Sequence, residues 1–155
     1  MKARRKPSEA KATRTVLGID RQLCFALYST GLAMDKVYRP LLRPLNLTYP
    51  QYLVMLVLWE TDGLTVTALG ERLFLDSATL TPLLKRLEQS GFVTRRRASE
   101  DERQVLISLT AAGRTLQDQV QDVQGAIFRA TQCSADELLA LKTQLERLRS
   151  RLRSV

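Results

Sequence analysis

The chain of 155 residues lacks histidine altogether and has only two cysteines, Cys24 and Cys133. Without histidine, and without a cluster of cysteines and spaced carboxylates, the sequence offers no recognisable metal site, so we expect neither a metal nor a cofactor. It also lacks an apolar run long enough to span a membrane and any segment that resembles a signal peptide. We therefore expect a cytoplasmic protein without a membrane partner, whose two cysteines are reduced thiols at rest rather than a structural disulfide.

Acidic residues are scarce relative to basic ones: 16 aspartates and glutamates stand against 24 lysines and arginines, which gives a net charge of +8. A basic balance of this size favours a polyanionic partner. Part of the charge lies in residues 1–15, which have no apolar stretch and are predicted to form a disordered basic tail. The remaining residues, 16–155, are enough for a single domain with its own core.

The most informative segment, residues 65–109, has the pattern of a helix, a short turn, a second helix and two β-rich stretches around a charged tip. Apolar residues at helical spacing predict the first helix over about Thr65–Leu73. Asp76 and Ser77 supply N-cap oxygens for the second helix, whose apolar stripe ends at Gly91, an expected left-handed C-cap. This order predicts a mainly α fold with a small β wing, a winged helix-turn-helix that binds duplex DNA.

The second helix of this segment carries polar side chains on the face opposite its apolar stripe. Hydroxyl and cationic groups of this kind reach base edges and phosphates when a helix lies in the major groove. Pro82 is awkward in a helix interior; it is tolerated in the first turn if the regular helix starts nearer Thr79. The candidate DNA-binding residues of this helix are Ser77, Thr79, Thr81, Lys85 and Arg86.

A hairpin follows, in which two β-rich stretches flank a polar tip at residues 95–103. On its own, such a hairpin could be a solvated loop whose charges only maintain solubility. Next to a helix-turn-helix it is expected to reach DNA, because an arginine at a hairpin tip can enter a narrow minor groove. Arg103 is the candidate, and Asp101 is expected to orient its guanidinium through paired hydrogen bonds.

The rest of the chain is predicted to be helical. Apolar residues over 19–41 mark a long first helix, broken near Pro40 and Pro44. A second helix begins at Thr48, which can cap it, while Pro50 suits its first turn.

Two more helices are predicted in the C-terminal part: one that Thr110 caps, over about 111–131, and a last one that the capping box Ser134–Glu137 opens. Together with the first helix they have apolar faces without an obvious partner in the same subunit, which we interpret as a homodimer interface. A two-fold dimer also suits pseudo-palindromic operator DNA. The expected division is a DNA-binding part at about 48–109 and dimerisation helices at about 17–44 and 110–153.

Three stretches carry a closer resemblance: LCFALYS around Cys24, LTYPQYLVMLVLWE around Tyr49, and LDSATLTPLLKRLE in the second helix of the DNA-binding segment. With them, roughly residues 18–150 resemble the MarR family of transcriptional regulators, and within it the organic-hydroperoxide-sensing (OhrR) branch. In that branch a reactive cysteine near the N-terminus senses peroxides and is hydrogen-bonded by tyrosines. The resemblance assigns these roles to Cys24 and to Tyr28, Tyr38 and Tyr49.

A lone cysteine on an amphipathic helix is most often a small core residue, and that alternative stands beside the sensing role of Cys24. Tyr28 lies one turn beyond Cys24 on the same face. Tyr38, fourteen residues after Cys24, would lie about 21 Å from Cys24 along a straight helix. If Tyr38 bonds Cys24, it must therefore come from the other subunit of a dimer. Phenolic donors aimed at the sulfur would stabilise a thiolate that attacks peroxide and becomes a sulfenic acid.

Cys133 directly precedes the Ser134 cap, so the helix N-terminus would favour its thiolate, and it could trap the sulfenic acid as a disulfide. The resemblance places the resolving cysteine of two-cysteine members about a turn earlier, near Arg129. Two interpretations of Cys133 therefore stay open: a resolving thiol, or a loop thiol without a partner.

These observations predict a repressor, not an enzyme, that leaves its operator when an organic hydroperoxide oxidises Cys24. A regulator released from DNA by a small aromatic ligand is the alternative within the same fold. A thiol peroxidase that uses Cys24 in turnover is less favoured, because the chain lacks the Pro, Thr, Cys and Arg cluster and the thioredoxin-like strand order of such enzymes.

Overall fold

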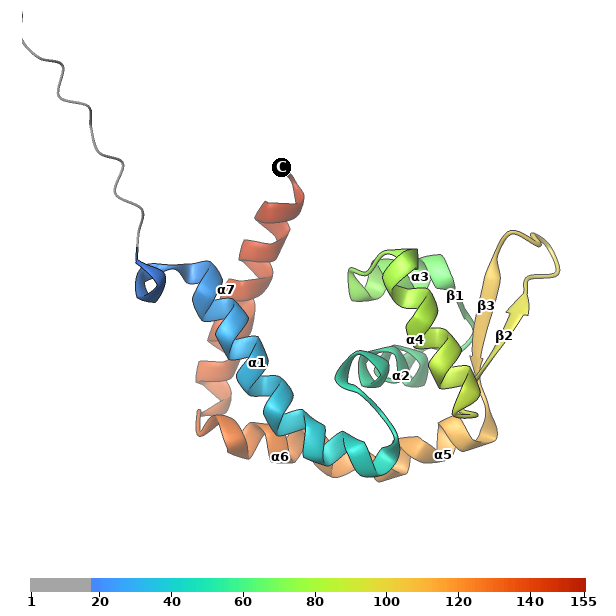
Figure 1. Ribbon diagram of the computed structural model, residues 1–155, viewed down its shortest axis with the longest axis horizontal. Helices are drawn as coiled ribbons and strands as arrows, with labels where there is room; N and C mark the ends of the chain where they lie inside the picture. Colours follow the sequence, from blue (N-terminus) through green and yellow to red (C-terminus); the bar gives the residue numbers. More distant parts are fainter. Residues whose placement is uncertain (1–17) are drawn as a thin grey trace, which may run out of the picture. The chain divides into compact units, whose positions relative to one another are not determined.

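A computed structural model describes residues 18–155; the segment 1–15, predicted as a disordered tail, lies outside the described residues. The chain divides into two units, one that ends at Ala33 and one that runs from Met34 to Val155, and each is described by itself. The elements are η1 (Ile19–Arg21), α1 (Leu23–Leu42), η2 (Arg43–Leu45), α2 (Tyr49–Glu60), β1 (Leu64–Thr65), α3 (Val66–Leu73), α4 (Ser77–Gln89), β2 (Val93–Arg97), β3 (Val105–Leu109), α5 (Ala111–Gln119), α6 (Gln121–Thr131) and α7 (Ala135–Arg153) (Figure 1).

The first long helix is not broken at Pro40, contrary to the prediction: α1 continues through this residue to Leu42. A proline at position 40 cannot donate a hydrogen bond to the carbonyl of Lys36, but Lys36 is exposed, so water can serve that carbonyl. The helix does end before Pro44, where η2 follows and Asn46 adopts the left-handed conformation, with φ 55°.

The helix caps follow the sequence closely. Thr48 forms a capping box with Gln51 at the start of α2, and Pro50 lies in the first turn of that helix. The Thr110 side chain accepts from the backbone N–H of Gly113 at 3.0 Å, and Ser134 opens α7 with a capping box. These short-range predictions are confirmed because each depends on residues within one turn.

The helix-turn-helix consists of α3, a tight turn and α4. The turn requires a glycine at position 70, because a Cβ there would lie 2.7 Å from the carbonyl oxygen of Leu75. Asp76 caps α4 by accepting from the N–H of Thr79 at 2.7 Å. The helix starts at Ser77 rather than nearer Thr79, so Pro82 lies inside the regular helix.

The wing is part of a three-stranded antiparallel sheet with the order β1-β3-β2. β2 pairs with β3 from Val93 opposite Leu109 to Arg97 opposite Val105. The short strand β1 pairs with β3 and was not predicted, since two residues are too few to show an alternating pattern.

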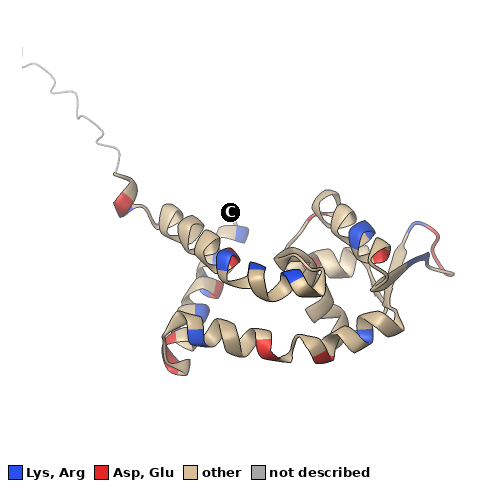
Figure 2. Ribbon diagram, turned by 60° about the horizontal axis from the view of Figure 1, so that its bottom comes forward, with Lys and Arg blue, Asp and Glu red and all other residues tan. Residues whose placement is uncertain are grey.

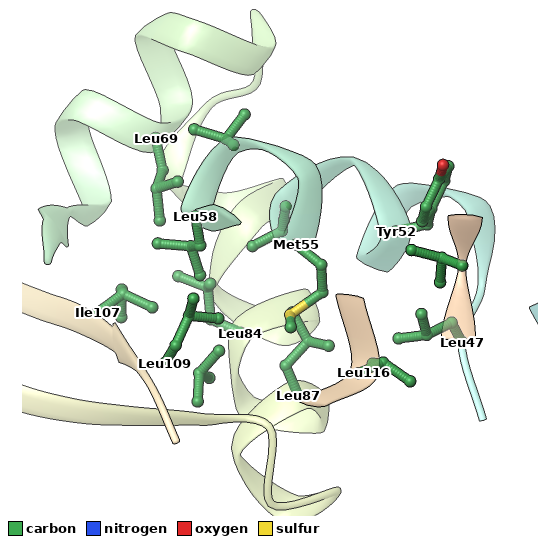
Figure 3. Packing of buried hydrophobic residues seen from close by; sticks show 14 of the residues in the cluster. Leu47, Tyr52, Met55, Leu58, Leu69, Leu84, Leu87, Ile107, Leu109 and Leu116 are labelled. Carbon is green, nitrogen blue, oxygen red and sulfur yellow. The ribbon is translucent and has the colours of Figure 1, made fainter. Parts of the chain in front are cut away.

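The core of the second unit lies between α2, the helix-turn-helix, the sheet and α5 (Figure 3). Leu69, Leu84 and Ile107 are completely buried there. The base of the wing packs on α5 so closely that a Cβ at Gly113 would lie 2.1 Å from the carbonyl oxygen of Phe92, and only glycine fits.

The single helix predicted over 111–131 is two helices, α5 and α6, with a break at Val120. No proline or glycine marks this break. Val120, which lies at the break, and Val123 in the first turn of α6 are both buried in the core. Among the helices of residues 18–155, none is long and apolar enough to cross a membrane.

Candidate DNA-binding surface and redox site

The predicted DNA-binding residues of α4 lie on its solvent-facing side. Lys85 and Arg86 are exposed, and neither is part of an ion pair among residues 18–155. Figure 2 shows basic positions both on α4 and on the neighbouring strand β2. Arg86 also lines a pocket of about 660 Å³ together with Arg43 and Thr48, which places it on the side of α4 that faces the start of α2.

The hydroxyl groups predicted for α4 are partly engaged within the helix. The Thr81 hydroxyl donates to the carbonyl oxygen of Ser77 at 2.7 Å. The backbone N–H and the side chain of Thr79 both bond the Asp76 carboxylate, and these hydrogen bonds lower the pKa of Asp76. Both hydroxyl oxygens keep lone pairs that can accept hydrogen bonds, while Ser77 is exposed in the first turn.

At the wing tip, Asp101 does not orient the Arg103 guanidinium as predicted. Its carboxylate accepts from the backbone N–H of Arg103 at 3.0 Å and from the side-chain amide of Gln104 at 3.3 Å. The short i to i+2 spacing favours such a turn over a bidentate pair, because the backbone donor is nearer than the end of a long side chain. The Arg103 side chain is exposed and forms no ion pair among residues 18–155.

Asp62 anchors the base of the wing. Its carboxylate accepts from the backbone N–H groups of Leu109 and Gly63 and from the Arg114 guanidinium, each at 2.8 Å. Burial alone would raise the pKa of Asp62, but these hydrogen bonds outweigh it and the pKa is lowered. The sequence analysis did not single out Asp62, because two of its partners, Leu109 and Arg114, lie 47 and 52 residues away in the chain.

Tyr38 and Tyr49, two of the predicted thiolate partners, lie together in the second unit. Their ring centroids are 4.4 Å apart, and Tyr52 lies 6.1 Å from Tyr38 and 6.5 Å from Tyr49. Burial, the neighbouring tyrosines and a hydrogen-bonding interaction with Tyr49 raise the pKa of Tyr38 to about 12. Burial also raises the pKa of Tyr49. Both phenols are therefore protonated hydrogen-bond donors at neutral pH.

Tyr52 is a member of this cluster that the sequence analysis treated only as an apolar position. The ring is almost fully buried, with 1% exposed, and lies 6.4 Å from the Trp59 ring. Its spacing of three residues from Tyr49 was the available signal, since residues i and i+3 share a helix face.

In the first unit, Cys24 and Tyr28 lie one turn apart on α1. Cys24 is exposed and Tyr28 exposes 65% of its surface. The alternative of a buried core cysteine therefore does not hold within one chain. A peroxide can reach this sulfur, which a redox-active thiol requires.

Cys133 is half-buried in the connection between α6 and α7. Its S–H donates to the carbonyl oxygen of Thr131 at 3.3 Å. The capping box at the start of α7 engages the backbone N–H groups of Ser134 and Glu137. The hydrogen bond described for this sulfur is to Thr131 and not to the first turn of α7.

Comparison with known proteins places this arrangement in a family. The family described as transcriptional regulator SarA/Rot matches residues 36–120. The organic hydroperoxide resistance transcriptional regulator of Bacillus subtilis is 52% identical over 127 residues, which cover 82% of this chain and 86% of that protein. The chain belongs to the MarR-type regulators, in the organic-hydroperoxide-resistance branch. The predicted family, fold and role as a transcriptional regulator are confirmed.

Solved structures of another MarR-type regulator, AbfR, allow a comparison between states. Reduced AbfR bound to DNA is 40% identical, with a TM-score of 0.74 over 86% of this chain and 93% of that one. The disulfide form of AbfR is 39% identical, with a TM-score of 0.59 over 88% and 90%. The fold of this chain is therefore similar to that of AbfR in both forms.

Proposed function

We propose that this regulator binds operator DNA as a homodimer when reduced, and that it releases the DNA when an organic hydroperoxide oxidises Cys24. The observation that carries the proposal is the pair of protonated phenols at Tyr38 and Tyr49. In a chain with an exposed Cys24 and a 52% identical organic hydroperoxide resistance regulator, such a pair is suited to hold a reactive sulfur.

The chemistry follows from the thiolate. The sulfur of Cys24 attacks the outer peroxide oxygen, the O–O bond breaks, and the products are a cysteine sulfenic acid and an alkoxide. The alkoxide is a stronger base than a phenolate, so it takes a proton from a neighbouring phenol or from water and leaves as the alcohol. Phenol O–H groups of Tyr28, Tyr38 and Tyr49 would stabilise the thiolate before the attack and then receive a proton back from solvent. The protein is not an enzyme in this scheme, because one oxidation per chain suffices for the signal.

A homodimer would cover apolar side chains that are exposed in a single chain. Large apolar side chains of α1 are exposed, including Leu23 at 58% and Leu32 at 49%, and so are Leu139 and Leu141 of α7. Monomeric proteins seldom expose apolar residues in such rows. A second copy would cover them and would bring its own Tyr38 and Tyr49 towards Cys24, as the spacing of these residues in the sequence requires.

The duplex would be held by α4 in the major groove and by the wing tip in the minor groove. Lys85 and Arg86 are free to contact DNA, and Arg103 extends from a tip whose backbone Asp101 has already ordered. The two copies of α4 in a dimer would read the two halves of a pseudo-palindrome. A regulator of this kind works in the cytoplasm, where the operator is.

The similarity to two states of AbfR favours release through disulfide formation. A disulfide requires Cα atoms within about 7 Å, and AbfR is known both in a reduced, DNA-bound form and in a disulfide form. Cys133 would be the resolving thiol, although its S–H bond to Thr131 has to break first. In the alternative, Cys133 takes no part and the sulfenic acid of Cys24 is itself the signal.

The experiment measures release of a fluorescein-labelled duplex that the reduced protein has selected from a random-sequence library. Cumene hydroperoxide should release wild-type protein, whereas Cys24→Ser should bind equally well and stay bound. Tyr38→Phe should slow the release. Cys133→Ser separates the two schemes: loss of release, together with loss of a dimer-mass band on a non-reducing gel, supports the disulfide. Release of Cys24→Ser by the peroxide would disprove the proposal.

A second candidate, release by a small aromatic ligand, has one observation in its favour. A cavity of about 250 Å³ lies between α2 and the α5–α6 junction, lined by Tyr52, Leu56, Trp59 and Gln124 among others. Trp59 is the single tryptophan of the chain, so its fluorescence reports occupancy directly. A saturable change on titration with benzoate, accompanied by release of DNA without oxidant, would favour this second function.

A further inference from the structure

The last turns of α7 contact the helix-turn-helix through two arginines. The guanidinium carbons of Arg149 and Arg153 lie 4.2 Å and 4.5 Å from the centroid of the Phe74 ring. The two arginines are one helical turn apart, so both reach the ring from one edge of α7. Neither was part of the predicted DNA-binding surface, because no pattern in the sequence relates residue 74 to the end of the chain.

Phe74 occupies an unusual position for an aromatic residue. It is the C-cap of α3, with φ 59°, and exposes 50% of its surface in the turn before α4. Bulky residues seldom adopt this left-handed conformation, which glycine or asparagine usually takes. A half-exposed ring held there is a platform, and guanidinium groups stack on such rings while their N–H edges stay free.

Neither stacked guanidinium group forms an ion pair within the described part of the chain. No ion pair of residues 18–155 includes Arg149 or Arg153, whereas Lys142, two turns earlier on the same helix, pairs with Glu146 at 2.8 Å. Two positive charges on one ring repel each other. An anion bound between them would offset that repulsion and would accept hydrogen bonds from both free edges.

The pair also lies beside the start of the recognition helix. Arg149 and Arg153 line a pocket of about 690 Å³ together with Phe74 and Ser77, the first residue of α4. Two carboxylates line it as well: that of Asp76 is engaged in capping α4, and that of Glu71 is exposed. When α4 lies in a major groove, the backbone phosphates that flank the groove pass close to its first turn.

We propose that Arg149 and Arg153, oriented by Phe74, form a phosphate-binding site for the DNA backbone next to the recognition helix. The last helix then extends the DNA-binding surface beyond the winged helix, in addition to any role in the dimer. The site rests on the proposed function, since its ligand is the duplex that this regulator binds. It holds the position of α4 on the duplex and is independent of base sequence.

The test compares two double variants of α7 that remove the same charge. In Arg149→Gln/Arg153→Gln the stacked pair is removed. In the control, Arg147→Gln/Arg151→Gln, two exposed arginines of the opposite helix edge are removed from the same turns. Affinity for the selected duplex is measured over a series of salt concentrations, and the thermal midpoint shows that each variant is folded.

Each phosphate that the protein neutralises contributes about 0.9 to the slope of log affinity against log salt. The stacked-pair variant should therefore reduce that slope by roughly two to four in a dimer, and the control much less. Phe74→Leu, which keeps an apolar residue but removes the ring, should weaken binding severalfold, and Arg149→Lys/Arg153→Lys should restore part of the slope. Equal slopes for the two double variants, or weaker binding at an unchanged slope, would show that the two arginines only hold the fold. If the wild-type protein selects no duplex at all, the proposed function fails first and this site fails with it.

Discussion

The helices α2 and α7 show two ways in which this chain uses apolar residues. Six of the twelve residues of α2 are buried, whereas none of the nineteen residues of α7 is buried, although leucines recur along it. The core around α2 is complete within one chain because helices and strands from 42 to 127 cover it on several sides. Several leucines of α7, including Leu139, Leu141 and Leu145, are exposed within one chain. The proposed homodimer would cover them, whereas the winged helix buries its apolar residues without a partner.

A matched pair of leucine substitutions tests whether apolar residues of the core are buried within one chain and those of α7 in a dimer. Leu84 of α4 is completely buried, while Leu145 of α7 exposes 38% of its surface. Leu84→Ala should lower the free energy of unfolding by about 2 to 5 kcal/mol at any protein concentration, because it leaves a cavity in a closed core. Leu145→Ala should act through the dimer, so its effect on the thermal midpoint should be largest at high protein concentration and should shrink as the protein is diluted and the dimer dissociates.

The measurement is thermal unfolding at several protein concentrations, with sedimentation to follow the dimer. If the midpoint of Leu145→Ala moved as far as that of Leu84→Ala and did so independently of concentration, α7 would belong to the core of one chain. The exposed leucines would then need another explanation.

The carboxylate of Asp62 gives a smaller, pH-dependent effect at the base of the wing. The folded state lowers the pKa of Asp62, so the carboxylate contributes stability above its unfolded pKa of about 3.9, and that stability is lost as the pH falls through the folded value. Asp62→Asn keeps an acceptor for the N–H of Leu109 but removes the Arg114 pair. The midpoint should drop by a few degrees at neutral pH, which corresponds to roughly 1 kcal/mol for a partly exposed group.

The difference between wild type and Asp62→Asn should shrink between pH 5 and pH 3, in a thermal unfolding series. Asp118→Asn is the control, because Asp118 is an exposed carboxylate with no ion pair among the described residues. A constant difference at all pH values would mean that the hydrogen bonds of Asp62 do not depend on its charge.

The comparison also explains what the sequence could predict. The caps at Thr48, Asp76, Thr110 and Ser134 and the two wing strands depend on residues close together in the chain, and each is where the sequence placed it. The family resemblance located Tyr38 and Tyr49, and the structure brings their rings together. The solvent-facing side of α4 could be inferred as well, because the apolar stripe of an amphipathic helix fixes its opposite face.

Features set by distant parts of the chain could not be predicted. The helix break at Val120 has no local signal, since neither proline nor glycine stands at it, and Val120 is buried in the core. Strand β1 exists because β3 returns beside it, and Phe74 meets Arg149 across seventy-five residues of chain. Asp101 was assigned the wrong partner for a different, local reason: the backbone N–H of Arg103 is nearer to its carboxylate than the end of the long side chain is.

The smallest expected effect on DNA binding concerns the wing tip. There, Asp101 forms hydrogen bonds within the chain, whereas the side chain of Arg103 is exposed. Asp101→Ala removes two hydrogen bonds that order the tip, to the backbone of Arg103 and to Gln104. Operator affinity should fall roughly two- to fivefold, equivalent to about 0.5 to 1 kcal/mol, with little change in its salt dependence, because every cation that reaches a phosphate is still present.

Arg103→Ala should instead flatten the slope of log affinity against log salt by about 0.9 for each phosphate that its guanidinium neutralises. Both affinities are measured on the selected duplex with folded, reduced protein, and Glu100→Ala, which removes an exposed charge at the tip without a described hydrogen bond, is the control. If Arg103→Ala left both affinity and slope unchanged, the wing would be a solvated hairpin, and DNA binding would lie with α4 and the arginines beside it.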